Sequence, residues 1–299
     1  MIDTYMTGLP WGRFRKFITP EADRFGLLKE LLEETKLDFK VVTLSGNRYF
    51  FIAPPLPGET FLRRRLTVLV AHYDRVPGSP GANDNGAGVF LLVQTALKLQ
   101  AEKVFNWLIV FTDKEELESG ESVLNQGAYA LASGFRDAGL EDPRIYSFDA
   151  CGTGDTLVIS TTAELLLKRK DPNPEKKKIR RSIRELREKA LEIARNLGME
   201  KVLLAPTPFS DDAGFFRAGM AAQTITMLPS DECGPLVSAL RKNPLFADAL
   251  VNRELQNAHD RRLIPETWRR LNGPGDSFLR LTPQHFRIVT RFAEALCKP

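Results

Sequence analysis

Cysteine and histidine are scarce in this sequence, which has only three of each among its 299 residues. The cysteines, Cys151, Cys233 and Cys297, are too few and too far apart for a disulfide framework, which excludes a disulfide-stabilised scaffold. We therefore expect a reducing, cytoplasmic location. Because histidine is so rare here, a histidine that stands within a metal-binding pattern is informative.

Long apolar stretches are also missing. None approaches the roughly 20 residues needed to span a bilayer, so we expect no membrane association. Residues 1–6 lack a basic segment followed by an apolar core, so we expect no signal peptide. The composition, 43% hydrophobic and 27% charged, is sufficient for unaided folding. The length is near the upper limit for one hydrophobic core, and we expect a single domain over residues 1–299.

A strong charge imbalance is absent too, since the net charge is only +4. The basic excess lies mainly in residues 168–170 and 176–195. Apolar residues recur there at helical spacing, as at Ile179, Ile183 and Leu186, which predicts a surface helix over 175–197 with a solvated basic face. No aromatic residues alternate with the basic ones, so we expect no nucleic-acid partner.

Apolar runs separated by helical patterns define the expected fold. Residues 66–71, 105–112 and 144–148 are nearly continuous apolar runs, which is typical of parallel strands covered on both faces. The pattern predicts an α/β fold with three α/β/α layers around a mixed, mostly parallel sheet. Further expected elements are a hairpin over 40–52, a strand over 224–228, helices over 21–35 and 86–100, and a last helix capped by Thr282. The stretch 229–270 lacks strand periodicity and is expected to form helices and loops over one side of the site.

Metal-type ligands follow three of the expected strands. His72 and Asp74 end the first run, Glu115 and Glu116 follow the second, and Asp149 ends the third, while Asp84 lies in the polar segment 81–86. In open parallel sheets, ligands bind beyond the carboxyl ends of the strands. Neighbouring strands lie about 4.8 Å apart, so these groups can share one or two cations. The pattern predicts a hydrolytic metal site.

Each of these motifs has an ordinary structural explanation when taken alone. A His-x-Asp sequence is commonly a satisfied polar pair, a Glu-Glu pair commonly starts a helix, and Asn-Asp-Asn-Gly commonly forms a turn. Asp149 could cap the element that follows it. The ordered combination, with each element at a strand end, favours the metal site.

The same combination resembles the co-catalytic zinc exopeptidases of peptidase clan MH. The resemblance runs from about Leu66 to the C-terminus and is greatest to the bacterial aminopeptidase branch, which also contains glutaminyl cyclases. It implies a role for each motif residue: His72 and Asp149 bind the first metal, Asp84 bridges two metals through a segment with a cis Asp84–Asn85 peptide, Asp74 orients the imidazole, Glu115 is the general base, and Glu116 binds the second metal.

Two positions depart from the pattern of these relatives. Asn272, in residues 271–277, occupies the place of a late histidine ligand, and an amide oxygen is a poorer zinc ligand than imidazole. Asp212 stands where relatives often carry histidine. The second site could be lost, could be completed by another residue such as His259, or could take Mg²⁺ or Mn²⁺. His285 is expected to be structural.

The expected function is that of a zinc-dependent hydrolase of the aminopeptidase type. It would cleave peptides or small amides with a metal-bound water as nucleophile and Glu115 as base, using one or two zinc ions. Two alternatives stay open: a single-metal acyltransferase resembling the glutaminyl cyclases, and a non-catalytic member with a binding role. The sequence does not identify the substrate side chain or the oligomeric state.

Overall fold

A mixed sheet forms the centre of the molecule. The computed structural model describes residues 5–6, 9–54, 65–118, 120–140, 142–167, 173–243, 245–251 and 261–298. Within these residues the central sheet has eight strands in the order β3-β4-β6-β5-β7-β10-β8-β9. The strands are β3 (Phe39–Leu44), β4 (Asn47–Ile52), β5 (Thr67–His72), β6 (Trp107–Thr112), β7 (Arg144–Phe148), β8 (Thr156–Ser160), β9 (Val202–Ala205) and β10 (Ala222–Leu228).

The four strands in the middle, β6, β5, β7 and β10, run parallel to one another. β4 pairs with β6 and β8 pairs with β10 in antiparallel ladders, so both flanks reverse direction. Each residue of β5 is buried, which explains its continuous apolar sequence. The predicted three-layer fold with a mixed, mostly parallel sheet is confirmed.

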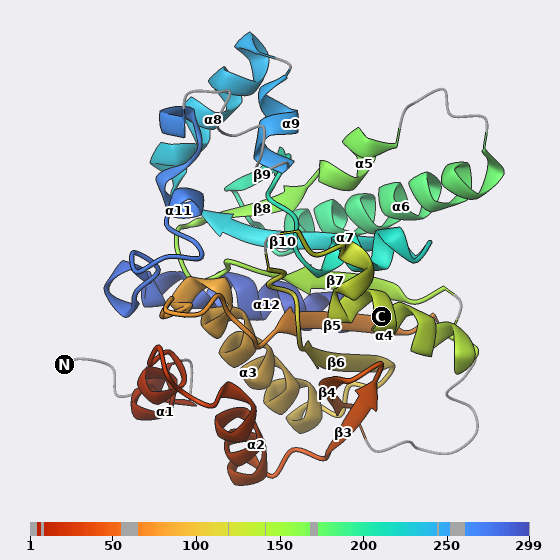
Figure 1. The fold of residues 1–299 in the computed structure, drawn as a ribbon, viewed down its shortest axis with the longest axis vertical. Coiled ribbons are helices and arrows are strands. Elements are labelled where there is room, and N and C mark those ends of the chain that lie inside the picture. Colours follow the sequence, from red (N-terminus) through yellow and green to blue (C-terminus); the bar gives the residue numbers. More distant parts are fainter. Residues whose placement is uncertain are drawn as a thin grey trace.

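Helices cover both faces of this sheet (Figure 1). Leu69 and Ala71 of β5 pack into the core shared with α3 (Gly88–Ala101), α6 (Pro174–Asn196) and α12 (Phe286–Cys297). Val68 and Val70 point to the opposite face and pack with α4 (Gly127–Asp137) and α7 (Asp211–Arg217). The strand period of two places alternate residues of one strand in the two layers.

Two N-terminal helices, α1 (Trp11–Phe17) and α2 (Arg24–Thr35), pack against the first layer. The ring of Phe14 meets that of Phe90 in α3 edge to face, with centroids 5.0 Å apart. Phe17 contacts the same ring at 5.5 Å. These contacts hold α1 against the first part of α3.

The stretch 229–270 forms helices where it is described, as predicted. α8 (Ser230–Lys242), α9 (Phe246–Val251) and α11 (Glu266–Arg269) share an apolar cluster with Val158, Ala205 and Leu228 of the sheet. Short elements complete the described chain: β1 (Tyr5–Met6), β2 (Leu9–Pro10), η2 (Ala82–Ala87), η3 (Val123–Asn125), α5 (Thr162–Leu166), η4 (Arg261–Leu263), η5 (Phe278–Arg280) and η6 (Pro283–His285).

The basic helix α6 matches its predicted pattern, because Ile183, Leu186 and Ala190 are buried while the lysines at 176–178 are exposed. The basic residues 168–170 lie outside the described part of the chain. No helix in the described segments is both long enough and apolar enough to cross a membrane.

Thr282 is the N-cap residue of η6, with Pro283 at the first position, but the side-chain hydrogen bond expected of a cap does not form. The Thr282 side chain caps neither η6 nor α12. Its Oγ1 instead accepts a hydrogen bond from the backbone N–H of Gly154 at 2.8 Å. Thr282 therefore fastens the start of the C-terminal segment to the loop that follows β7, and α12 itself begins only at Phe286.

Candidate metal centre

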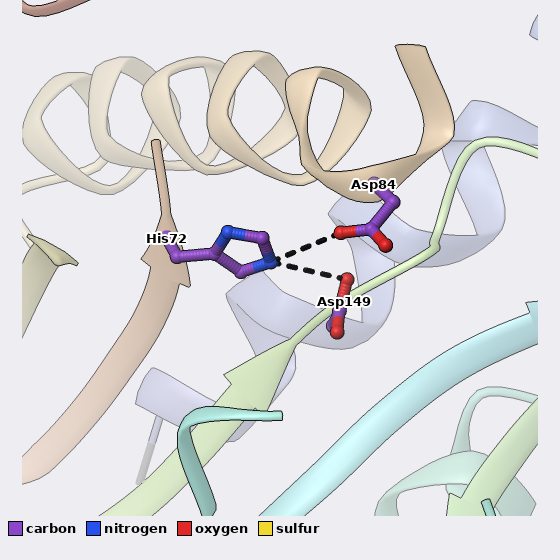
Figure 2. Close-up of side chains that lie close together, drawn as sticks. All are labelled: His72, Asp84 and Asp149. Carbon is purple, nitrogen blue, oxygen red and sulfur yellow. Dashed lines mark ion pairs between the residues drawn. The ribbon is translucent and has the colours of Figure 1, made fainter. Parts of the chain in front are cut away.

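Three predicted metal ligands converge at the carboxyl edge of the sheet. His72 is the last residue of β5, Asp149 directly follows the neighbouring parallel strand β7, and Asp84 lies in the segment before α3. His72 Nε2 lies 3.2 Å from Asp84 Oδ1 and 3.5 Å from Asp149 Oδ1. Figure 2 shows both carboxylates directed to the same ring nitrogen. The strand-end positions thus place one nitrogen and two oxygens around a common point.

The spacing of these three atoms fits a tetrahedral zinc shell. Ligand atoms about 2.0–2.2 Å from a tetrahedral metal are separated from one another by roughly 3.4 Å. The side-chain atoms His72 Nε2, Asp84 Oδ1 and Asp149 Oδ1 are buried, yet none of them makes a hydrogen bond of acceptable geometry. Buried polar atoms are normally satisfied, so three such atoms at this separation fit a shared cation better than contacts with one another.

Asp74 supports the opposite side of the imidazole. Its Oδ1 lies 3.3 Å from His72 Nδ1, and its Oδ2 accepts a hydrogen bond from the backbone N–H of Glu116 at 3.0 Å. A carboxylate behind a ligating histidine fixes the ring orientation and the tautomer. Asp74 therefore couples the end of β5 to the loop that carries Glu115 and Glu116.

The segment around Asp84 is held by hydrogen bonds from both of its neighbours. Asn83 Oδ1 accepts from the backbone N–H of Gly152 at 2.6 Å, and Asn85 Nδ2 donates to the carbonyl of Phe148 at 2.7 Å. Both bonds tie this segment to the residues that flank Asp149. The Asp84–Asn85 peptide is cis, as the family resemblance implied. The Asn-Asp-Asn-Gly sequence is thus more than a surface turn.

Asp276 fastens the same segment from the C-terminal part of the chain. Its two carboxylate oxygens accept the backbone N–H groups of Asn83 and Asp84 at 2.8 and 2.9 Å. Burial, followed by the charge of Asp84, raises the pKa of Asp276 to about 7. The bidentate contact fixes the direction in which the Asp84 side chain leaves the backbone.

Burial and mutual repulsion perturb the carboxylates of the site. Burial raises the pKa of Asp84, and the charge of Asp149 raises it further. Burial, and then the charge of Asp84, raises the pKa of Glu116 to about 9. Burial also raises the pKa of Glu115 well above its usual value. Burial opposes protonation of His72, but the carboxylates of Asp149, Asp74 and Asp84 raise its pKa well above the usual range. Crowded carboxylates with raised pKa values favour binding of a cation.

Glu115 lies next to the cluster and faces a cavity. His72, Glu115 and Glu116 form a second group whose possible ligand atoms all lie within 4.8 Å of one another. Gln126 Nε2 donates to Glu115 Oε1 at 3.1 Å. A cavity of about 560 Å³ is lined by Asp84, Asp149 and both glutamates. A small substrate in this cavity would meet the predicted ligands and the predicted base together.

The second metal site, predicted from Asp84, Glu116 and Asn272, lacks the imidazole ligand that the first site has. Asn272 lines the same cavity as Asp84 and Glu116, and its backbone has a φ of 63°, a conformation that asparagine tolerates. Glu116 groups with His72 and Glu115. Asp212 is buried at the start of α7, where its Oδ1 accepts the backbone N–H of Ser210. His259 lies outside the described residues.

Three residues near the site had no assigned role in the sequence analysis. Gln126 precedes α4, Asp276 lies more than a hundred residues from its partners, and Arg24 starts α2. Asp276 lies in residues 271–277, the segment that the resemblance marks through Asn272, and this position could have indicated it. Gln126 and Arg24 belong to no motif, and only their positions in the folded chain reveal them.

His285 is the last residue of η6. It lines a separate surface cavity of about 530 Å³ with Met199, Lys201 and Arg291. It therefore does not join the metal ligands.

Solved structures of similar fold include both enzyme types named by the resemblance. The zinc aminopeptidase BSAP from Bacillus subtilis superimposes with a TM-score of 0.53 at 19% identity over 84% of this chain and 48% of its own. The LapA aminopeptidase of Legionella pneumophila gives 0.61 at 15% identity, over 96% and 67%. A glutaminyl cyclase of Porphyromonas gingivalis gives 0.59 at 13% identity, over 96% and 95%. At these identities the likeness establishes the fold, and the chain spans about half the length of BSAP.

No curated protein matches this chain significantly in sequence. The sequence profile of peptidase family M28, in contrast, matches residues 54–237, which include His72, Asp84, Glu115, Glu116 and Asp149. Because the matched region is more than half of the chain, the protein belongs to peptidase family M28.

Proposed function

We propose that the protein is a metal-dependent hydrolase of the aminopeptidase type that cleaves peptides or small amides. The observation that carries this proposal is the cluster of His72, Asp84 and Asp149 beside Glu115. His72 Nε2 lies 3.2 and 3.5 Å from one carboxylate oxygen of each aspartate, and none of these three buried atoms makes a hydrogen bond. Nitrogen and carboxylate oxygen are the ligands that zinc accepts in catalytic sites. BSAP and LapA, which share this fold, are aminopeptidases, and this supports the assignment of the bond class.

His72, Asp84 and Asp149 would hold the first zinc ion, and Asp84, Glu116 and Asn272 would hold a second zinc or a harder cation such as Mg²⁺ or Mn²⁺. When bound, the metal supplies Lewis-acid chemistry and lowers the pKa of water towards neutrality. Asp74 would keep the His72 proton on Nδ1, which leaves Nε2 free to bind the metal.

Glu115 would act as the general base and later as the general acid. Gln126 holds one of its carboxylate oxygens at 3.1 Å, which leaves the other oxygen to accept a proton from the attacking water. The same oxygen would then deliver that proton to the leaving amine. The cavity beside Glu115, about 560 Å³ in volume, is large enough for a short peptide but not for a folded protein segment.

The test is hydrolysis by the purified full-length chain of aminoacyl p-nitroanilides and short peptides, before and after chelation and again after zinc is restored. We expect turnover that disappears with the metal and returns with it, and we expect His72→Ala to lose both metal and turnover. Equal turnover in the wild type, the chelated protein and the variant would remove the proposal. A cytoplasmic location stays a prediction.

One observation favours a second candidate, a glutaminyl cyclase. The Porphyromonas gingivalis glutaminyl cyclase superimposes over 96% of this chain with a TM-score of 0.59, compared with 84% and 0.53 for BSAP. Incubation with a peptide that begins with glutamine separates the two functions. A cyclase releases ammonia and retains every peptide bond, whereas an aminopeptidase releases free glutamine. A protein that binds metal but does neither would fit the non-catalytic alternative.

A further inference from the structure

Arg24 is a buried arginine whose five N–H donors all have acceptors. Its side chain belongs to the first residue of α2, and the residue is only 5% exposed. Nε donates to the carbonyl of Phe17 at 3.3 Å, Nη1 donates to Tyr73 and Asp74 at 3.2 and 3.0 Å, and Nη2 donates to Pro80 and Gly81 at 2.8 and 2.7 Å. A guanidinium has five N–H donors in a planar fork, so the hydrogen-bonding capacity of this side chain is fully used.

The four acceptors of Nη1 and Nη2 lie at the two ends of the loop 73–81, which connects β5 with the segment that contains Asp84. Tyr73 and Asp74 directly follow His72, while Pro80 and Gly81 lead into the segment with Asp84. The guanidinium therefore joins the end of β5 to the start of the Asp84 segment. Position 81 requires glycine, because a Cβ there would lie 2.5 Å from Arg24 Nη2 and because the backbone φ is +56°.

The positive charge of Arg24 interacts with carboxylates of the metal site. Among the described residues it forms no ion pair, and the carboxylates that favour its charged form are those of Asp74, Asp84 and Asp276. Burial, followed by the charge of Arg75, lowers the pKa of Arg24 to about 9, so the group stays a cation at neutral pH. Burying a guanidinium without a close counter-ion is costly, and here carbonyl dipoles and the carboxylates of the metal site offset this cost.

We propose that Arg24 is a positioning residue of the metal centre, which sets the separation of His72 and Asp84 by holding together the two ends of the loop 73–81 that connects them. This inference rests on the proposed function. It assigns part of the metal centre to the N-terminal helices, because Arg24 lies outside residues 54–237, the part matched by the family profile. Arg24 does not touch the ligand atoms, and its influence passes through Tyr73, Asp74 and Gly81.

Zinc affinity is the quantity that tests this proposal. The full-length chain is stripped of metal, and zinc is titrated in competition with a chromophoric chelator, while the absorption spectrum of the cobalt-substituted protein reports the ligand geometry. Loss of a group that orients metal ligands typically lowers metal affinity about 10- to 100-fold. We expect such a loss in Arg24→Gln, together with an altered cobalt spectrum and far-ultraviolet circular dichroism like that of the wild type.

Arg24→Lys separates the hydrogen bonds from the charge. Lysine keeps the positive charge but has three donors on one atom and cannot bridge both ends of the loop 73–81, so the zinc affinity of this variant should also fall. If Arg24→Gln does not fold, Arg24→Lys decides the question alone. Wild-type affinity and an unchanged cobalt spectrum in Arg24→Lys would overturn the proposal.

Arg75 provides a matched control within the same region. Arg75 lies in the loop 73–81 and also ties it to the N-terminal segment, by donating to the carbonyls of Thr19, Pro20 and Ala22. Unlike Arg24, it does not bridge the two ends of this loop. Arg75→Gln should lower the melting temperature and leave zinc affinity within about threefold of the wild type. An equal loss of affinity in the Arg75 and Arg24 variants would show a general packing effect and refute the proposal. Absence of zinc binding by the wild type would refute the proposed function instead.

Discussion

Replacement of Glu115 by glutamine tests the chemical step without disturbing the ligand cluster. The two side chains have nearly the same volume, and glutamine can still accept the hydrogen bond that Gln126 donates to Glu115 Oε1 at 3.1 Å. His72, Asp84 and Asp149 are unchanged, so the first metal should remain bound. What the variant lacks is a carboxylate oxygen that can take a proton from water and return it to the amine.

A positioned general base contributes about 10²- to 10⁴-fold to the rate. At 1.36 kcal/mol for each factor of ten, this corresponds to about 2.7–5.4 kcal/mol of activation free energy. We therefore expect kcat of Glu115→Gln to fall by two to four orders of magnitude, with KM and zinc content little changed. Initial rates on an aminoacyl p-nitroanilide and metal analysis of the same samples provide the measurement.

Glu118→Gln is the matched control, because Glu118 is an exposed glutamate three positions further along the same loop. It should keep wild-type turnover. If Glu115→Gln kept kcat within about tenfold of the wild type with its metal bound, Glu115 would not be the base. If it lost zinc together with activity, Glu115 would be a metal ligand, a role that its group with His72 and Glu116 also permits.

Three further predictions concern the second site, a buried acid and backbone packing. Asn272→His should raise zinc content towards two per chain, because imidazole is a better zinc ligand than an amide; an unchanged content by elemental analysis would exclude Asn272 from the site. Burial raises the pKa of Asp212 to about 6 in the folded protein, above an unfolded value of about 3.9. Ionisation of Asp212 therefore destabilises the fold as the pH rises through this range. Above pH 6 the whole penalty is present, at most roughly 3 kcal/mol of unfolding free energy. Asp212→Asn should therefore gain unfolding free energy at pH 8 but not at pH 4, which urea denaturation at both pH values would show; an equal gain at both would contradict the account. A Cβ on Gly127 would lie 1.9 Å from the carbonyl oxygen of Asp113, so Gly127→Ala should lower the unfolding free energy by about 1–3 kcal/mol. As a control, Gly12→Ala adds a Cβ with no atom within 4 Å and should be neutral or stabilising in the same denaturation assay.

The elements that sequence predicted well are those fixed by local pattern. The continuous apolar runs became β5, β6 and β7, because strands covered on both faces bury nearly every side chain. His72 and Asp149 could be placed together because the carboxyl ends of parallel strands meet at one edge. The strand β9 was not predicted, since its four residues are short and two of them are only half-buried.

What local pattern could not supply are the contacts between distant segments. Thr282 has the sequence signature of a helix cap, but its hydroxyl is used by the backbone of Gly154. Arg24 and Gln126 carry no recognisable motif, and their roles follow only from the loops and side chains that the fold brings to them. Sequence therefore predicted the candidate metal ligands better than the residues that hold those ligands and the base in place.

Anomalous scattering at the zinc absorption edge from a crystal of the protein would show whether His72, Asp84 and Asp149 hold a zinc ion. We expect a peak about 2 Å from His72 Nε2 and from one oxygen each of Asp84 and Asp149. A crystal grown with zinc that shows no peak among these three side chains, or shows the metal bound elsewhere on the chain, would contradict this expectation.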